Sequence, residues 1–469
     1  MNTCDAREAC VKADIFRAYD IRGVVGKDLT PEGVYQIGQA YGSQALEEGE
    51  KRVFVARDGR LSGPLLSESL ISGIRSTGCG VIDLGCVPTP VLYFATYEFS
   101  PESRSGIMLT GSHNPKDHNG LKMVLVHKSV CLEAITGLYQ RIVDQRFSVG
   151  KSFGPYESQN ILTQYLQKIT QTVVIKRPLK VVVDAGSGVP GLIAPRVFQA
   201  LGCEVIALYC EVDGEFPHHH PDPSKPKNLE DLIAAVKTHQ ADAGLAFDGD
   251  GDRLGVVTPS GKIIWPDRQL MLYAREVLKT YPGAQIIFDV KCSQFLADVI
   301  LQAGGKPLMY KTGHSLIKQK LKETGAPLAG EMSGHMFFND KWPGFDDGIY
   351  TGARLLEILG AFSGDLDALF QSIPEGISTP ELNIEVPEAE KFEWVEKLKQ
   401  AAQFPDARMI DIDGMRIEFK DSWGLVRASN TTPCLVLRFE ALTVEGLVQV
   451  QEKFRGLFQR VVPQLKMPF

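Results

Sequence analysis

Residues 241–253 read ADAGLAFDGDGDR, and the rest of the chain can be interpreted outward from this stretch. Ala243, Leu245 and Phe247 predict a short buried strand, which breaks into a glycine-spaced loop with three acidic side chains. Because alternate residues of an extended segment share a face, we expect these carboxylates to converge and to repel one another unless a cation neutralises them. The three acids are Asp248, Asp250 and Asp252.

The residues around the acidic loop narrow the choice of cation. A calcium loop of the EF-hand kind needs Gly at its sixth position and Glu at its twelfth, where this chain has Arg253 and Pro259. Magnesium, held by a few carboxylates and a phosphate oxygen, fits better. Arg253 would then offer a guanidinium fork to an anionic ligand beside the metal. A solvated acidic turn is the alternative if the motif is taken alone.

The chain contains an internal repeat in which the acidic loop has two counterparts. Three times, an apolar strand ending in Asp is followed by a helical stretch, a glycine-led second strand and a third strand that runs into a polar loop. This order predicts α/β units with mostly parallel strands, whose ligand loops lie beyond the strand carboxyl ends and could face one cleft. The third strands and their loops are GIMLTGSHNP from Gly106, AGLAFDGDGD from Ala243 and APLAGEMSGH from Ala326.

After about residue 375 the pattern changes. A proline-flanked link leads to a strand, a helical stretch, several strands between residues 408 and 442, and a closing helix. Turn residues between neighbouring strands, together with alternating polar and apolar side chains, predict an α+β domain with an antiparallel sheet.

Composition limits the classes of function. The net charge of −7 argues against a general binder of nucleic acid or of acidic membranes. The chain has no apolar signal region and no run of about eighteen apolar residues, so we expect a cytoplasmic protein. Nine cysteines, scattered without C-x-x-C spacing, favour reduced thiols over disulfides or zinc.

The loop TGSHNP places Ser112 between Gly111 and His113. It lacks the G-x-S-x-G pattern, and adjacent Ser and His side chains point apart in an extended loop, so a serine-hydrolase dyad is not expected. A serine on a strand-end loop next to a magnesium site is instead well placed to carry a phosphoryl group. A polar turn is the alternative if the acidic loop is ignored.

Two further loops predict ligand contacts. Glu331, Ser333 and His335 alternate in GEMSGH and would face the same way, which suits a polyhydroxylated ligand, although a turn with a solvated Glu would look similar. RASNTTP, from Arg427, is an ordinary hairpin sequence whose N–H groups, hydroxyls and guanidinium could also cradle a phosphate.

TGSHNP, DGDGDR, GEMSGH and RASNTTP, in this order and together with FRAYDIRG near the start, resemble the α-D-phosphohexomutases, in particular the bacterial phosphomannomutase/phosphoglucomutase group. The resemblance covers essentially the full chain. It implies three repeated mixed α/β domains plus a C-terminal α+β domain around a central cleft. We place the domains at residues 1–157, 158–262, 263–374 and 375–469. His118, where Tyr is common, and Lys227, where Glu is common, depart from the family pattern.

The resemblance also assigns roles to residues. Ser112 would be the phosphoserine, and it would hold Mg²⁺ together with Asp248, Asp250 and Asp252. Glu331 and Ser333 would bind sugar hydroxyls. The phosphate that does not react would be held by Arg427, Ser429, Asn430 and Thr431. Other residues expected to line the cleft are Tyr19, Arg22, Lys122, Arg253, Lys291, His314 and His335.

The implied activity is reversible phosphoryl transfer between C1 and C6 of mannose and glucose phosphates, through a phosphoserine and a hexose 1,6-bisphosphate that is both intermediate and activator. Arg22, Lys122, Arg253 and His335 join Ser112 as expected catalytic residues, with Lys122 and His335 as candidates for proton transfer. We expect a monomer whose partners are small hexose phosphates. Two rivals stay open: a magnesium phosphatase that uses Asp250 and Asp252, and a non-catalytic metal- or anion-binding protein.

Overall fold

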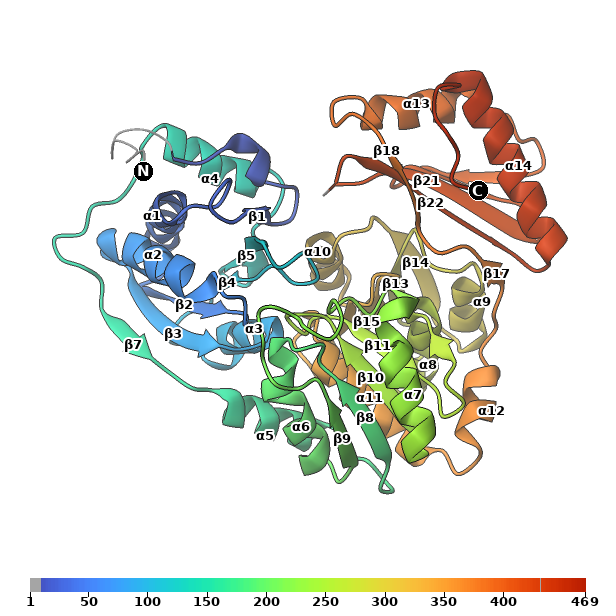
Figure 1. Ribbon diagram of the computed structural model, residues 1–469, viewed down its shortest axis with the longest axis horizontal. Helices are drawn as coiled ribbons and strands as arrows, with labels where there is room; N and C mark the ends of the chain where they lie inside the picture. Colours follow the sequence, from blue (N-terminus) through green and yellow to red (C-terminus); the bar gives the residue numbers. More distant parts are fainter. Residues whose placement is uncertain (1–9, 431) are drawn as a thin grey trace.

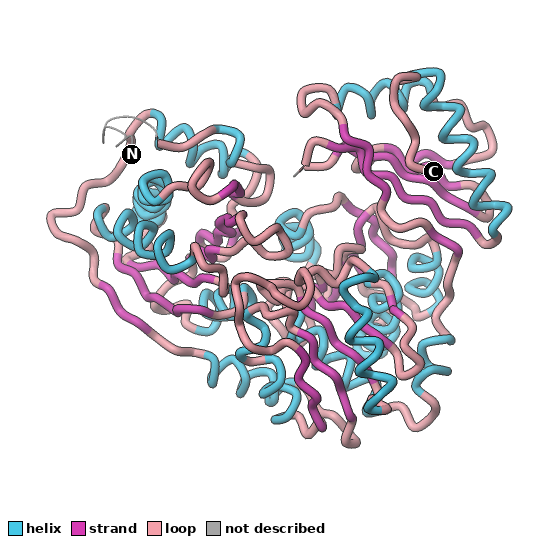
Figure 2. Tube along the Cα trace, in the orientation of Figure 1, coloured by secondary structure: helices cyan, strands magenta, loops and turns pink. Residues whose placement is uncertain are grey.

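The computed structural model describes residues 10–430 and 432–469. Four units surround a central region, coloured from blue through green and yellow to red in Figure 1. In Figure 2 the loops of the different units meet in the middle of the molecule, while most helices lie on the outside of the strands. The expected class, three mixed α/β sheets plus a C-terminal antiparallel sheet, is confirmed.

The first unit contains a seven-stranded sheet in the order β1-β5-β4-β2-β3-β7, with β6 paired to β5. Its strands are β1 (Ile21–Val24), β2 (Arg52–Arg57), β3 (Gly80–Cys86), β4 (Gly106–Leu109), β5 (His118–Leu125), β6 (Lys128–Ser129) and β7 (Tyr156–Ser158). Its helices are α1 (Pro31–Glu47), α2 (Gly63–Ser76), α3 (Thr89–Glu98) and α4 (Glu133–Val143).

The second unit has the sheet order β12-β11-β10-β8-β9, and the third has β14-β13-β15-β16. The second consists of α5 (Leu162–Thr172), β8 (Lys180–Asp184), α6 (Ala194–Ala200), β9 (Glu204–Leu208), α7 (Glu230–His239), β10 (Ala243–Phe247), β11 (Leu254–Val257) and β12 (Ile263–Ile264). The third consists of α8 (Pro266–Thr280), β13 (Gln285–Asp289), α9 (Phe295–Gln302), β14 (Lys306–Tyr310), α10 (His314–Thr324), β15 (Leu328–Gly330), β16 (Met336–Phe338), α11 (Gly348–Ala361) and α12 (Leu366–Gln371).

The predicted repeat is visible in the pairing of the strands. In each unit the first strand lies between the second and third and is parallel to both, as β2 is to β3 and β4, β8 to β9 and β10, and β13 to β14 and β15. A fourth strand then turns back antiparallel to the third. Each polar loop therefore lies at the carboxyl end of a third strand, where parallel sheets bind ligands.

The C-terminal unit contains a sheet in the order β17-β22-β21-β20-β19, with β18 also paired to β22, and all its pairs are antiparallel. Its elements are β17 (Ile377–Ser378), β18 (Leu382–Glu385), α13 (Lys391–Ala401), β19 (Arg408–Ile410), β20 (Met415–Glu418), β21 (Ser422–Ala428), β22 (Cys434–Ala441) and α14 (Val444–Val461). Both long helices pack on this sheet (Figure 1).

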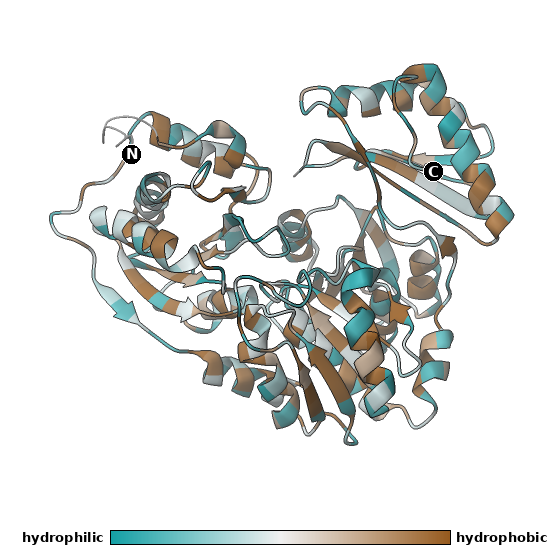
Figure 3. Cartoon of the chain, in the orientation of Figure 1, coloured by the Kyte–Doolittle hydropathy of each residue, from teal (hydrophilic) through white to brown (hydrophobic). Residues whose placement is uncertain are grey.

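The first three units share an apolar core, and the fourth has a separate one. One continuous cluster includes Phe54 of the first unit, Val183 of the second and Phe288 of the third, whereas the C-terminal unit has a core of its own. The strands that form these cores are mostly brown in the hydropathy colouring of Figure 3. Among the described residues, the only apolar cluster shared by the third and fourth units is a small one around Val290 and Trp423. The first three units therefore form one body, and the fourth is the part best able to move.

Two expectations from composition can be compared with the structure. Seven cysteines are free thiols, but Cys10 is disulfide-bonded, so the expectation of reduced thiols is wrong at this position. Scattered spacing could not reveal a single pair. Within the described part of the chain, no helix is long and apolar enough to cross a membrane.

Candidate active site

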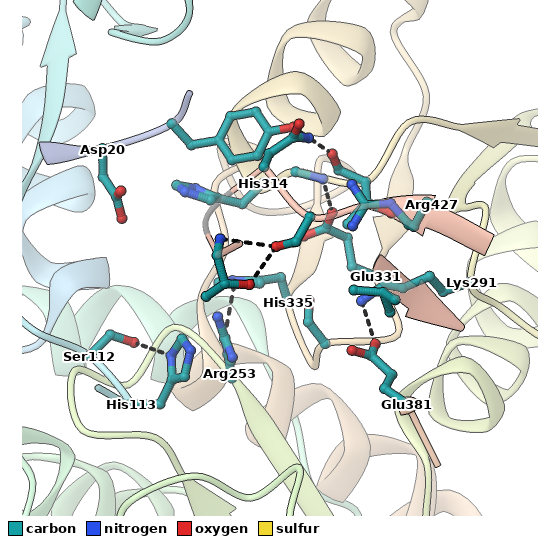
Figure 4. Close-up of a pocket in the computed structure, with 18 of the residues that line it drawn as sticks. Asp20, Ser112, His113, Arg253, Lys291, His314, Glu331, His335, Glu381 and Arg427 are labelled. Carbon is teal, nitrogen blue, oxygen red and sulfur yellow. Dashed lines mark hydrogen bonds and ion pairs between the residues drawn. The ribbon is translucent and has the colours of Figure 1, made fainter. Parts of the chain in front are cut away.

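A cavity of about 260 Å³ is lined by side chains from all four units (Figure 4). In that view Ser112 and Arg427 lie on opposite sides, and Glu331 and His335 lie between them. Of the residues expected to line the cleft, those found there are Tyr19, Arg22, Ser112, Lys122, Arg253, Lys291, His314, Glu331, Ser333, His335, Arg427, Ser429 and Asn430. Thr431 lies outside the described residues.

The loop that carries Ser112 is shaped by a buried ion pair at the end of β2. The Arg60 guanidinium donates hydrogen bonds to four backbone oxygens of the loop and its flank, including those of Ser112 at 2.8 Å and Asn114 at 2.6 Å. Asp58 accepts from Arg60 Nε at 3.2 Å and from Gly111 N at 3.0 Å. The loop can therefore hold Ser112 in a left-handed conformation, with φ 48°, that non-glycine residues seldom adopt.

Ser112 points at the acidic loop of the second unit. Its Oγ donates a hydrogen bond to Asp248 Oδ2 at 2.7 Å and lies 3.1 Å from His113 Nδ1. The serine is 3% exposed, and its hydroxyl is part of the cleft wall. The two loops that the repeat predicts to meet are therefore in direct contact.

The backbone conformation of the acidic loop differs from the extended one that was expected. Residues 248–253 form a turn and not an extended segment, because Asp248 Oδ1 accepts from the backbone N–H groups of Gly251 at 3.1 Å and Arg253 at 3.2 Å. Gly251, with φ 79°, supplies the conformation that this curl requires. Carboxylate oxygens of Asp248, Asp250 and Asp252 nevertheless lie within 4.8 Å of one another, and all three residues are fully buried.

Lys122 balances the charge of the acidic loop. Its Nζ lies 2.7 Å from Asp250 Oδ2 and also contacts Asp252 Oδ2. Burial and the two neighbouring carboxylates raise the pKa of Asp248, whereas at Asp250 the Lys122 ammonium outweighs burial and lowers the pKa. Such opposed shifts within one cluster are typical of sites that bind cations or move protons.

The three acids fit a hard divalent cation. Asp250 Oδ1 and Asp252 Oδ1 are buried without a hydrogen-bond partner among the described residues. Together with Asp248 and the Ser112 hydroxyl they offer only oxygen ligands, the donor type that Mg²⁺ prefers. No soft sulfur donor belongs to this cluster.

The loop after β15, which carries Glu331, Ser333 and His335 and is expected to bind sugar (below, the sugar loop), is also a turn, although an extended segment was expected. Gly334 N bonds to Glu331 O at 3.1 Å, and Glu331 N bonds to His335 O at 2.9 Å. Glu331, Ser333 and His335 all line the cleft as the alternation predicted, but the turn brings them there. The Glu331 carboxylate accepts a hydrogen bond from Gly313 N, which ties this loop to the start of α10.

His335 lies between two charged residues. Its Nε2 accepts a hydrogen bond from Arg253 Nε at 3.0 Å, and its Nδ1 is 3.0 Å from Asp346 Oδ2. These partners indicate the tautomer with the proton on Nδ1 and the lone pair on Nε2. Asp346 is fully buried and was missed in the sequence, because no local pattern connects it to the cleft.

The C-terminal unit supplies the remaining wall. Arg427 Nε bonds to Asp413 Oδ2 at 3.1 Å, and Ser429 Oγ lies 2.8 Å from Thr432 Oγ1. Asn430 Nδ2 donates to the Tyr19 hydroxyl at 2.6 Å, so the first and last units touch across the cleft.

Two further ion pairs fix the positions of basic side chains in the cleft. Lys291 Nζ bonds to Glu381 Oε1 at 2.6 Å, and Arg22 Nη2 bonds to Asp20 Oδ2 at 2.6 Å. Other lining residues that were not predicted are Asp20, His113, Thr312, Gly313, Glu381, Asn383, Thr432 and Val436. Asp20 and His113 adjoin predicted residues within quoted motifs, whereas Glu381 follows the interdomain link and carries no recognisable signal.

Comparison with known proteins agrees with this geometry. Phosphoglucomutase/phosphomannomutase family models match the chain as alpha/beta/alpha domain I over residues 13–145, domain II over 163–261, domain III over 265–376 and the C-terminal domain over 381–457. The chain belongs to this family, whose members interconvert hexose 1- and 6-phosphates.

Individual relatives are similar over almost their whole length. Phosphomannomutase/phosphoglucomutase of Pseudomonas aeruginosa is 54% identical over 464 residues, which covers 99% of both chains. Phosphoglucomutase of Neisseria meningitidis is 51% identical over 453 residues, 96% of this chain and 98% of the relative. A crystal structure of a family protein from Burkholderia thailandensis has a TM-score of 0.93 and 52% identity, covering 98% of this chain and 100% of that one. The expected enzyme class is therefore confirmed.

Proposed function

We propose that the enzyme moves a phosphoryl group between C1 and C6 of mannose and glucose phosphates by way of phosphorylated Ser112 and a hexose 1,6-bisphosphate. The observation that carries this proposal is the hydrogen bond of 2.7 Å from Ser112 Oγ to Asp248. It places a nucleophilic hydroxyl directly against an acidic cluster suited to Mg²⁺.

Asp248, Asp250 and Asp252, together with phosphorylated Ser112, would hold the magnesium ion. When bound, Mg²⁺ would stabilise the negative charge that spreads over the phosphoryl oxygens during transfer. Arg253 contributes a second positive charge from the same turn. Its side chain already reaches His335 Nε2, so it lies between the acidic loop and the sugar loop.

Proton transfer is assigned to Lys122 Nζ and His335 Nε2. The attacking sugar hydroxyl must lose a proton, and the serine oxygen must regain one when the phosphoryl group returns. Lys122 Nζ lies against the acidic loop. His335 Nε2, which accepts a hydrogen bond from Arg253 Nε in this structure, would become free to take a proton once Arg253 turns to the phosphoryl group. Arg22, held by Asp20, would contact the phosphoryl group beside Ser112.

Substrate is proposed to bridge the sugar loop and the C-terminal unit. The Glu331 carboxylate would accept hydrogen bonds from sugar hydroxyls, and the Ser333 hydroxyl would exchange hydrogen bonds with them. His314 and Tyr19 line the cleft beside these two residues. The distal phosphate is held by Lys291 and by Arg427, Ser429, Asn430 and Thr431. Reorientation of the bisphosphate needs space, so the C-terminal unit would open by a hinge near residues 370–380, where its core separates from the others.

Several coarser expectations complete the proposal. We place the domain boundaries at residues 157, 262 and 374. The first two fall between matched family regions, whereas residue 374 falls inside the match to domain III, which ends at residue 376. The substrates are small hexose phosphates, and hexose 1,6-bisphosphate is the activator that loads Ser112. A monomer in the cytoplasm, without nucleic-acid or membrane partners, stays our prediction.

The test is the phosphorylation state of Ser112. Intact mass with peptide mapping should find phosphate on this residue after purification. Unphosphorylated enzyme should accept phosphate on Ser112 from glucose 1,6-bisphosphate and release glucose monophosphate. Ser112→Ala should remain folded and lose most turnover, because a loop hydroxyl contributes little to packing. Phosphate found reproducibly on another residue would overturn Ser112 as the donor. Release of inorganic phosphate equal to sugar turnover would favour a phosphatase.

A further inference from the structure

A second cavity, of about 690 Å³, lies between the first and third units and shares no lining residue with the active-site cleft. We call it the interface cavity. Its walls come from α3, from the β5–β6 hairpin, from α10, which packs against β6, and from the loop after β16. Figure 1 labels α3, β5 and α10. Because its walls belong to two units, a ligand bound there would contact both.

The charge of the interface cavity is positive. Lys128, Lys318 and Lys322 line it, and Glu323 is the only acidic residue among its lining residues. Glu323 is engaged by Lys320, whereas Lys128 and Lys322 form no ion pair with any described residue. Two uncompensated ammonium groups beside one cavity favour an anionic ligand, and phosphate is the common metabolite anion that lysines bind.

Aromatic rings form another wall of the interface cavity. Tyr97 stacks on His127 with ring centroids 4.5 Å apart and on Phe345 at 5.9 Å. Tyr93 lies under Lys318, whose Nζ is 4.1 Å from the ring centroid. Stacked rings of this kind offer a flat, polarizable surface to a planar group.

The hairpin that presents His127 is held in an unfavourable conformation. Val126 and His127 have φ values of 50° and 60°, a region that glycine or asparagine usually occupies in two-residue hairpins and that is costly for a β-branched side chain. Three hydrogen bonds fix the turn: from Val126 N to Ser105 Oγ, from His127 N to Arg104 O, and between His127 Nε2 and Thr96 O. Strain maintained in this way is common where a side chain has a binding role.

The inner end of the interface cavity is connected to the catalytic cleft. Lys318 Nζ, besides lining the cavity, bonds to Asp346 Oδ1 at 2.9 Å. The other carboxylate oxygen of Asp346 lies 3.0 Å from His335 Nδ1. An anion that reaches Lys318 would compete with Asp346 for this ammonium and so act on the residue that orients His335.

We propose that the interface cavity is a regulatory site for a phosphorylated metabolite with a planar ring, such as a nucleoside diphosphate. The phosphates lie near Lys128, Lys318 and Lys322, and the planar ring packs on the aromatic wall formed by Tyr97 and His127. Binding reduces turnover through Lys318 and Asp346 and does not exclude substrate. This site is additional to the proposed catalytic function and does not depend on the role of Ser112.

Binding can be measured by isothermal titration calorimetry on the full-length protein, with ADP, GDP and UDP as probes, excess Mg²⁺, and glucose 1-phosphate at saturation to block the catalytic cleft. We expect at least one nucleotide to bind under these conditions, more tightly than pyrophosphate or the free nucleoside. Lys128→Ala with Lys322→Ala should weaken that binding at least about tenfold. Lys51→Ala with Lys306→Ala is the matched control, since both lysines are exposed, form no ion pair with a described residue and do not line the cavity, and this variant should bind normally.

Kinetics test the connection to His335. The bound nucleotide should lower kcat for glucose 1-phosphate at unchanged KM, and the Lys128/Lys322 double variant should keep normal basal activity while losing this inhibition. The proposal is overturned if no probe binds at millimolar concentration, if saturating substrate displaces the probe, or if the Lys51/Lys306 double variant weakens binding as much as the Lys128/Lys322 double variant. Binding without any change in kcat would overturn the connection through Lys318.

Discussion

Arg60 Nη2 donates a hydrogen bond to the backbone oxygen of Ser112 at 2.8 Å. The two residues are far apart in sequence, yet this guanidinium, which is 1% exposed, bonds four backbone oxygens of the serine loop and its flank. The position and the left-handed conformation of Ser112 therefore depend on a side chain of another strand end.

The first prediction concerns this support. Arg60→Ala leaves the Asp58 carboxylate buried without its partner, which typically costs about 3–5 kcal/mol of stability, and it also releases the Ser112 loop. We expect a lower unfolding midpoint in urea and a much reduced kcat. Arg52→Ala is the control, because Arg52 makes only half-exposed ion pairs with Glu102 and Glu157, and such pairs contribute about 0–1 kcal/mol. Equal stability of the two variants would contradict the role given to Arg60.

The overall architecture could be predicted because each repeated unit shows short sequence patterns that can be recognised without long-range contacts. The apolar runs that end in Asp58, Asp184 and Asp289 are each about ten residues long or shorter, and so are the third strands with their loops. Hydrophobic periodicity therefore reveals them. The antiparallel fourth strand of each unit was not predicted individually, since a short return strand differs little in sequence from the strand before it.

The detailed geometry of the site could be predicted less well from the sequence. Alternation in DGDGDR and GEMSGH predicted convergent side chains, and they do converge, but through turns closed by hydrogen bonds to Asp248 and Glu331. Arg60, Asp346 and Glu381 act on cleft residues over long sequence separations, and only tertiary packing brings them there. One sequence without an alignment contains no signal for such contacts.

The second prediction concerns pH. Burial raises the pKa of the Asp347 carboxyl to about 7 from the ordinary value of 3.8, although hydrogen bonds from Tyr350 N and the Tyr165 hydroxyl act in the opposite direction. The folded state therefore binds this proton more tightly than the unfolded state. The contribution of Asp347 to the free energy of unfolding is fully present below about pH 4 and is lost as pH rises towards 7, by at most about 1.4 kcal/mol per pH unit.

Asp347→Asn provides the comparison. Asn has the shape of the neutral acid and is a good N-cap, so it can retain the bond from Tyr350 N at the start of α11. Urea midpoints measured at several pH values should fall less steeply between pH 4 and 7 in this variant than in the parent. If both proteins show the same slope, Asp347 is not protonated in the folded state.

The third prediction concerns the metal. Asp250→Asn removes one charge from the acidic loop while leaving an oxygen for the Thr89 hydroxyl, which now bonds to Asp250 at 2.5 Å. The Mg²⁺ concentration needed for half-maximal activity should rise more than about tenfold. Asp184→Asn is the matched control, since Asp184 is a fully buried aspartate of the same sheet that bonds to His219 outside the cluster. A normal Mg²⁺ requirement in Asp250→Asn would exclude it as a ligand.

The fourth prediction separates the phosphate cradle from an ordinary hairpin. Arg427 is 5% exposed and pairs only with Asp413 among the described acids, so an incoming phosphate would find a largely desolvated guanidinium. Arg427→Ala should lower kcat/KM by roughly 2–4 kcal/mol from either substrate direction, because the cradle holds a phosphate in both half-reactions. Arg408→Ala, an exposed arginine on the same sheet, should leave kcat/KM unchanged. If the kinetics of Arg427→Ala are unchanged, RASNTTP is a structural hairpin that does not bind the phosphate.

The final prediction concerns substrate range. A bisphosphate that reorients must bind in two orientations with either phosphate in the cradle of Arg427, so Glu331 and Ser333 should bond hydroxyls that are placed similarly in both. The hydroxyls at C3 and C4 meet this condition better than the one at C2. If no buried group is committed to C2, inverting that carbon leaves nothing unpaired, and discrimination should stay within about 1.4 kcal/mol, a factor of roughly ten. We therefore expect kcat/KM for mannose 1-phosphate and glucose 1-phosphate to agree within that factor, with poorer use of glucosamine 1-phosphate. Parallel assays of the three sugars decide the matter, and a preference above about a hundredfold for one epimer would require a contact that reads C2 and would end the assignment of dual specificity.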